Sequence, residues 1–93
     1  MAKLTVYTDR GVRNSVARQY LLDLGVDFDE VNVDTDSGAV EFLESKGRDT
    51  KHHPLPQFYV GETLAYENGF KDISVLNATQ INQRVEEINA ANT

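Results

Sequence analysis

The chain has 93 residues, of which 40% are hydrophobic and 26% charged, a composition typical of one globular domain. It carries 15 acidic and 9 basic side chains, which give a net charge of −6. This charge disfavours nucleic acid and anionic membranes as partners, because both are bound through clustered lysine and arginine. No apolar run approaches the ~20 residues of a membrane-spanning helix. The first residues have no signal-peptide core, so we expect a cytoplasmic location.

The sequence contains no cysteine. Disulfide bonds, thiolate metal sites and any reaction that uses a protein sulfur nucleophile are therefore excluded. Any site in this chain must work through other side chains or through the backbone.

The first half of the chain alternates between strand and helix patterns. Leu4–Thr8 is rich in β-branched and aromatic residues and predicts a strand. Apolar residues at helical spacing predict a helix over Arg13–Leu24, and Gly25 follows in the position that ends helices. Phe28–Val33 alternates between apolar and polar residues and predicts a second strand.

A second helix is predicted around Val40 and Leu43. The polar turn before it, residues 34–37, offers side chains that cap a helix N-terminus, and Gly47 marks its end. Gln57–Val60 and Thr63–Tyr66 predict two short strands joined by a tight turn, which makes a hairpin.

The end of the chain predicts two helices. Asp72 is the expected cap of a short helix that contains Ile73 and Leu76. The sequence Asn77-Ala78-Thr79-Gln80 resembles a capping box, and the apolar residues after it, Ile81, Val85 and Ile88, share one helix face.

The predicted order is β-α-β-α-β-β-α. The first crossover connection must be right-handed, which makes the first two strands parallel. The hairpin adds two antiparallel strands. We therefore expect an α/β domain over residues 1–93, with a mixed four-stranded sheet and helices on both faces.

Three segments resemble glutaredoxins, a family with the thioredoxin fold. Leu4–Thr8 followed by Gly11 and a helix resembles the start of that family. Leu55-Pro56-Gln57-Phe58-Tyr59-Val60 resembles its Thr-Val-Pro segment, in which the proline is cis, and residues 68–73 resemble its Gly-Gly-x-x-Asp segment. The resemblance runs from about Lys3 to Ile88 and implies a thioredoxin fold.

The resemblance fails at the residues that carry the family's chemistry. Val12-Arg13-Asn14-Ser15 stands where glutaredoxins have Cys-x-x-Cys, so both sulfurs are replaced, by Val12 and Ser15. Thiol–disulfide exchange needs one sulfur to attack and one to leave. We therefore expect no thiol–disulfide oxidoreductase activity and no catalytic residue at these positions.

The resemblance also implies a cleft for glutathione. Relatives place a lysine or arginine where this chain has Asp9, of opposite charge, with Arg10 and Arg13 close by. The residues that the resemblance assigns to a ligand or partner cleft are Arg10, Gly11, Val12, Arg13, Asn14, Ser15, Leu55, Pro56, Gly69 and Asp72. A cis bond before Pro56 would leave the neighbouring backbone free to pair with an extended peptide. We expect a protein or peptide partner in this cleft.

Two alternative functions remain open at this point. The first is that the chain is a cysteine-substituted variant of an active glutaredoxin, a glutathione-dependent disulfide reductase of the kind that passes electrons to enzymes such as ribonucleotide reductase. A glutathione transferase-like enzyme that uses Tyr7 or Ser15 is disfavoured, because transferases add a helical domain that this length does not accommodate.

Metal binding and serine–histidine chemistry are also disfavoured. His52 and His53 are adjacent, and adjacent side chains rarely point in the same direction. No third metal ligand stands at a recognisable spacing from them. No acidic residue stands at a spacing that would indicate the orienting partner of a histidine beside Ser15. The acidic residues between positions 23 and 36 are interpreted as a solvated face.

Overall fold

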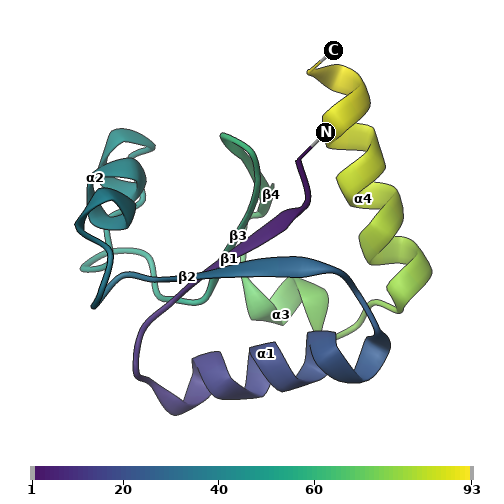
Figure 1. The fold of residues 1–93 in the computed structure, drawn as a ribbon, viewed down its shortest axis with the longest axis horizontal. Helices are drawn as coiled ribbons and strands as arrows, with labels where there is room; N and C mark the ends of the chain where they lie inside the picture. Colours follow the sequence, from purple (N-terminus) through teal and green to yellow (C-terminus); the bar gives the residue numbers. More distant parts are fainter. Residues whose placement is uncertain (1, 93) are drawn as a thin grey trace.

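The computed structural model describes residues 2–92, which form a sheet enclosed by helices (Figure 1). The first half contains β1 (Leu4–Thr8), α1 (Val12–Leu24), β2 (Phe28–Asn32) and α2 (Ser37–Ser45). The second half contains β3 (Gln57–Val60), β4 (Thr63–Tyr66), α3 (Phe70–Ile73) and α4 (Ala78–Ala91). The predicted order of elements is confirmed, with α3 as a single turn before the last long helix.

The sheet has four strands in the order β2-β1-β3-β4. β1 runs parallel to β2, with Leu4 opposite Phe28, and antiparallel to β3, with Leu4 opposite Val60. β3 and β4 form an antiparallel hairpin. The predicted mixed sheet, with one parallel pair and a final hairpin, is confirmed.

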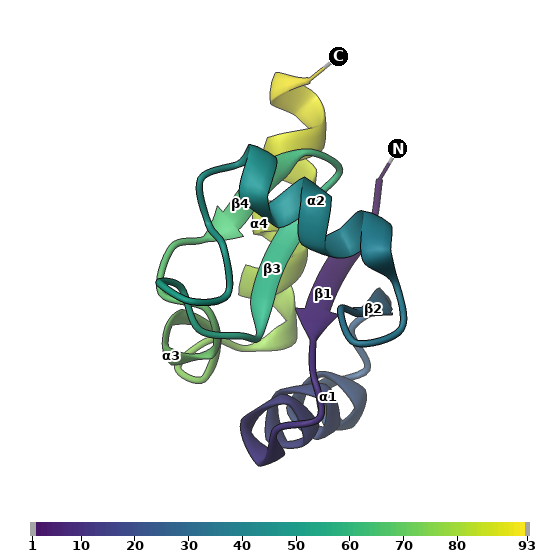
Figure 2. The same cartoon turned by 90° about the vertical axis from the view of Figure 1, so that its left-hand side faces the viewer.

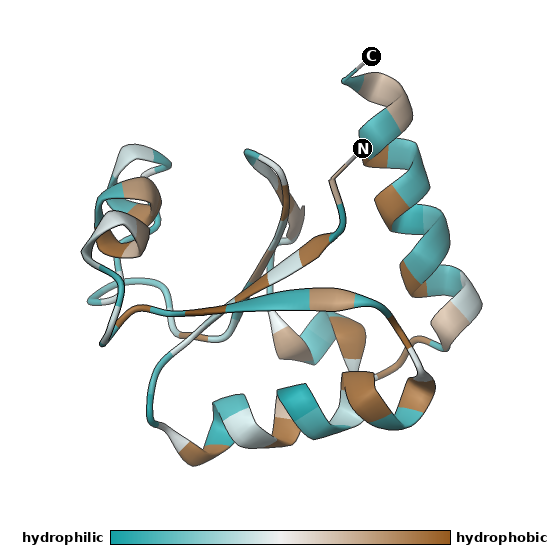
Figure 3. Cartoon of the chain, in the orientation of Figure 1, coloured by the Kyte–Doolittle hydropathy of each residue, from teal (hydrophilic) through white to brown (hydrophobic). Residues whose placement is uncertain are grey.

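Helices cover both faces of the sheet. On one face, side chains of α1, α3 and α4 complete a core with the strands, and its buried members include Leu4, Leu21, Phe58, Ile73 and Ile81. Hydrophobic turns of α4 face the sheet in Figure 3. Figure 2 shows α2 across the opposite face, where a smaller core holds Leu43, Leu55 and Tyr59.

Several predicted helix ends are confirmed by their hydrogen bonds. The Asp36 side chain accepts from the Ala39 N–H at 3.3 Å and begins α2. Asn77 and Gln80 form a complete capping box at the start of α4. Gly25 ends α1 with a φ of 73°, a left-handed conformation that suits glycine.

The predicted role of Asp72 as a helix cap is wrong. Gly69 precedes α3 with a φ of 59°, and Asp72 lies inside the helix. Because Gly69 turns the chain three residues earlier, the Asp72 carboxylate reaches back and accepts from the Asn68 N–H at 3.1 Å. Two other boundaries differ by one residue: α1 begins at Val12 and β2 ends at Asn32.

Within residues 2–92, every helix is too short or too polar to cross a membrane.

Candidate functional site

Three adjoining hollows lie where α1 begins, beside the loop that leads into β3. Their volumes are about 420, 300 and 370 Å³. Arg13 and Pro54 line all three, so the hollows are continuous, and together we call them the groove. The residues around it are Asp9, Gly11, Val12, Arg13, Asn14, Arg48, Thr50, His53, Pro54, Leu55, Pro56, Gln57, Glu67, Asn68, Gly69, Phe70 and Lys71.

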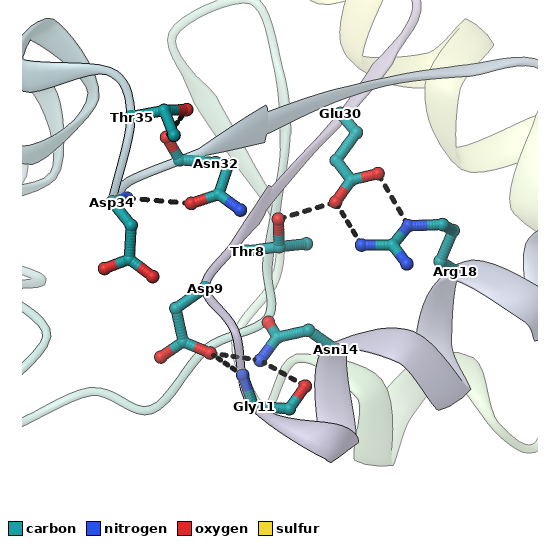
Figure 4. A network of polar contacts seen from close by, with 9 residues as sticks. All are labelled: Thr8, Asp9, Gly11, Asn14, Arg18, Glu30, Asn32, Asp34 and Thr35. Carbon is teal, nitrogen blue, oxygen red and sulfur yellow. Dashed lines mark hydrogen bonds and ion pairs between the residues drawn. The ribbon is translucent and has the colours of Figure 1, made fainter.

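The start of α1 is fixed by a carboxylate (Figure 4). Gly11 precedes the helix and has no capping side chain of its own. Asp9 Oδ1 accepts from the Gly11 N–H at 2.8 Å and from Asn14 Nδ2 at 2.5 Å. The aspartate therefore places a negative charge at the positive end of the helix. A second anion would meet that charge here.

Val12, which the resemblance places where glutaredoxins have their attacking cysteine, is 80% exposed. It lines the first hollow, whereas Ser15, also exposed, lines none of the three. An aliphatic side chain has no proton to lose and no electron pair to donate. The surface that Val12 offers is suited to apolar contact with another molecule.

The loop before β3 brings an unpaired stretch of backbone to the groove. The bond between Leu55 and Pro56 is cis, as the resemblance implies. Leu55 is 7% exposed and belongs to the core with Leu43 and Tyr59, yet it lines two of the hollows. No other residue within 2–92 hydrogen-bonds to its N–H or C=O. An approaching backbone finds one donor and one acceptor there.

This loop is held from behind by buried polar contacts. Gln57 is 2% exposed, and its Nε2 donates to the carbonyls of Arg48 at 3.0 Å and His53 at 3.3 Å. Gly69 packs closely against the same loop, because a Cβ built on Gly69 would lie 2.7 Å from the Pro56 carbonyl oxygen. The backbone of the groove is therefore positioned by packing and hydrogen bonding.

Two cations that the sequence did not single out enter the same hollow as Arg13. Arg48 and Lys71 line it, and none of the three forms an ion pair with another residue in the described range 2–92. Arg48 Nη2 donates to the Glu67 carbonyl at 2.7 Å, while its buried Nε has no partner there. No sequence motif predicts the cluster of Arg13, Arg48 and Lys71, because these residues come from three separate segments of the chain.

Three of the predicted cleft residues lie outside the groove. Arg10 turns toward the sheet edge, where its Nε is 3.6 Å from Asp34 Oδ2. The Asp72 carboxylate is occupied by the backbone and side chain of Asn68. Ser15 faces solvent. The other seven, Gly11, Val12, Arg13, Asn14, Leu55, Pro56 and Gly69, are brought together.

An ion pair anchors α1 to the sheet beside the groove (Figure 4). Arg18 Nε donates to Glu30 Oε1 at 2.6 Å, and Thr8 Oγ1 donates to Glu30 Oε2 at 2.8 Å. The hydrogen bond from Arg18 is the largest influence on the carboxyl and lowers the pKa of Glu30. These contacts join α1, β1 and β2 and hold the middle of the helix against the sheet.

Tyr7 and His52, the remaining candidates for a chemical role, each contact a neighbouring side chain. Tyr7 stacks on Phe42 with ring centroids 5.4 Å apart, and burial, aided by the charge of Asp36, raises the pKa of its hydroxyl. His52 Nδ1 lies 3.0 Å from the Asp49 carboxylate at the surface. Residues 2–92 contain no group of three histidine or acidic side chains able to hold a metal ion.

No protein-family model matches the sequence, and a search of curated proteins finds no similar one. The interpretation of the groove therefore depends on the chemistry of its own residues.

Proposed function

We propose that this protein is a glutaredoxin-like domain without redox activity, which binds a protein or peptide partner in the groove. The element order, the mixed sheet and the helices on both faces are compatible with a thioredoxin-like fold and support this proposal. The absence of sulfur nucleophiles supports the redox-silent part, because disulfide exchange has no substitute for them.

The observation that carries the proposal is that Val12 and Leu55 line the same hollow. Val12 offers an exposed apolar side chain, and Leu55 offers a backbone N–H and C=O to which nothing in residues 2–92 hydrogen-bonds. An extended peptide satisfies both at once, since its backbone pairs like an added strand while a side chain covers the valine. A small polar ligand would leave the valine uncovered.

Glutathione remains a ligand that the resemblance implies, and two observations weigh against it. The Asp72 side chain, one of its expected contacts, is bonded to Asn68. The carboxylate of Asp9 stands where relatives carry a cation, and it is bonded at the start of α1. We therefore propose a peptide segment of a partner protein as the ligand, with glutathione as the comparison in any titration.

The test is selection from a displayed peptide library, using Val12→Asp and Val75→Asp as matched variants. The two valines are almost equally exposed, 80% and 79%, and Val75 lines none of the three hollows of the groove. Selected peptides should lose binding to Val12→Asp and keep it with Val75→Asp, and should shift the amide signal of Leu55. Peptides that bind Val12→Asp as well as the parent would contradict the proposal. Turnover of hydroxyethyl disulfide by the purified protein would contradict its redox-silent part.

A further inference from the structure

Positive charge is concentrated in the groove of a chain that is negative overall. The net charge is −6, yet Arg13, Arg48 and Lys71 line one hollow of about 370 Å³. Glu67 is the acidic residue that lines it with them. Like charges brought together repel each other, so this arrangement costs free energy unless an anion joins it.

Basic residues elsewhere on the surface are mostly compensated. Lys3, Arg10, Arg18 and Lys46 each lie within 4.0 Å of a carboxylate of the same chain. Arg13, Arg48 and Lys71 have no such neighbour within residues 2–92. Lys51 and Arg84 also form no ion pair in that range, but they line none of the three hollows, so the groove is where several cations without a carboxylate partner come together. Two acidic residues, Asp9 and Glu67, line the groove as well, and Asp9 is bonded to Gly11 and Asn14 at the start of α1.

Arg48 adds a directional signal to this charge. Its backbone carbonyl is held by Gln57, and its Nη2 donates to the Glu67 carbonyl, so the guanidinium is fixed in position. Its Nε is buried and has no hydrogen-bond partner in the range 2–92. Because this atom is closed to solvent, a ligand carboxylate is expected at the terminal nitrogens of the guanidinium, where charge-assisted hydrogen bonds are strong.

The groove also has apolar lining. Val12, Leu55 and Phe70 line the two hollows nearer the start of α1. Successive side chains of an extended peptide point to opposite sides, at about 3.3 Å per residue. A strand paired with Leu55 can therefore turn alternate side chains toward the cations and toward the valine.

We propose that the groove selects acidic extended segments, in which carboxylate side chains alternate with aliphatic ones. This inference rests on the proposed function, since it names the chemistry of the partner that the groove binds. The carboxylates contact Arg13, Arg48 and Lys71, and the aliphatic side chains cover Val12.

The test compares two capped heptapeptides, one of alternating glutamate and valine and one with glutamine in place of glutamate. Binding is followed by amide shifts of the full chain at low and at moderate salt. We expect the glutamate peptide to bind about tenfold more tightly, with the advantage shrinking as salt screens the charges. Shifts should centre on Leu55 and Arg13.

Charge-removing variants locate the effect. Lys71→Gln and Arg13→Gln, both at exposed positions, should each weaken binding of the glutamate peptide about three- to tenfold. Arg48→Gln should do the same, but it also breaks the bond to Glu67, so the two exposed variants decide the question. Lys3→Gln is the matched control, because it removes the same charge beside Asp27, outside the groove, and should change binding less than about twofold.

The outcomes separate this inference from the proposed function. Equal binding of the glutamate and glutamine peptides in the groove would overturn the acidic preference and leave the binding function standing. Absence of shifts at the groove with either peptide would overturn both. Tighter binding of a short single-stranded oligonucleotide than of the glutamate peptide would also overturn the inference, since the cations would then recognise phosphate.

Discussion

The Asn14 side chain donates from Nδ2 to the Asp9 carboxylate over 2.5 Å, and this bond closes the start of α1 on the end of β1. Asn14 is 2% exposed and Asp9 is half-buried, so the contact is partly shielded from water. Asp9 also accepts from the Gly11 N–H. The positive end of the helix, which would favour a thiolate at this place, thus already faces a negative charge of the chain itself.

This arrangement predicts a weakly acidic thiol in a Val12→Cys/Ser15→Cys variant. A helix N-terminus favours a thiolate through its dipole and free N–H groups, but the Asp9 carboxylate opposes a second negative charge beside it. We expect the pKa of the introduced thiol at position 12 to stay near the ordinary cysteine value of about 8.5. Ultraviolet absorbance of the thiolate against pH measures it.

Adding Asp9→Asn to the double cysteine variant tests whether the Asp9 charge is what keeps the thiol pKa high. The amide keeps an oxygen that accepts from Gly11 but carries no charge, so the thiol pKa should fall by about one unit. If the double cysteine variant alone has a strongly acidic thiol and reduces a mixed disulfide with glutathione rapidly, the chain would be better described as a substituted active glutaredoxin.

The buried amide of Asn14 should contribute to stability. Asn14→Ala removes the donor to Asp9 but also removes Oδ1, which is buried without a partner in the described chain. The two effects oppose each other, so we expect a loss of about 1–2 kcal/mol in the free energy of unfolding. Urea denaturation measures it, and exposed Ser15→Ala should stay within about 0.5 kcal/mol of the parent. A stabilised Asn14→Ala protein would show that the orphan oxygen dominates.

The sequence predicted those features that depend on neighbouring residues. Gly25 ends α1, and the Asn77–Gln80 box begins α4, because each is decided by hydrogen bonds within a few residues. The alternating and helical patterns, together with the handedness of the crossover, were enough to predict the mixed sheet.

Features that depend on distant residues were not predicted. Arg48 and Lys71 meet in the groove only because the loop before β3 and the start of α3 pack together. Arg10 looked available for a ligand, but folding places Asp34 beside it. Whether a charged side chain meets an opposite charge depends on residues that are distant in the chain and are brought together by folding, so no local sequence pattern predicts it.

Gly69 and Pro56 approach so closely that Gly69→Ala should be costly. The φ of 59° and ψ of −131° lie in a region that is essentially restricted to glycine, and the added Cβ would lie 2.7 Å from the Pro56 carbonyl oxygen. We expect a loss of about 3 kcal/mol or more in the free energy of unfolding, measured by urea denaturation.

Gly25→Ala is the control for backbone conformation alone. Gly25 also has a positive φ, of 73°, but nothing lies within 4 Å of its built Cβ. Its substitution should cost only about 1 kcal/mol, the ordinary penalty of a left-handed non-glycine residue. Equal losses for the two variants would mean that the loop yields to Gly69→Ala and that the contact with Pro56 does not fix the groove.

The Glu30 carboxylate should make stability depend on pH in a defined direction. Arg18 lowers the pKa of Glu30 in the folded state, so the stabilisation is present above the unfolded pKa of about 4.3 and is lost as pH falls through the folded value. Glu30→Gln should therefore cost about 1 kcal/mol at neutral pH and progressively less as the pH is lowered toward about 2, because protonation removes the charge that Arg18 pairs with. Urea denaturation at both pH values measures the difference, with exposed Glu86→Gln as the control. A loss of the same size at both pH values would show that Glu30 acts through packing, and its charge would then have no part in holding α1 on the sheet.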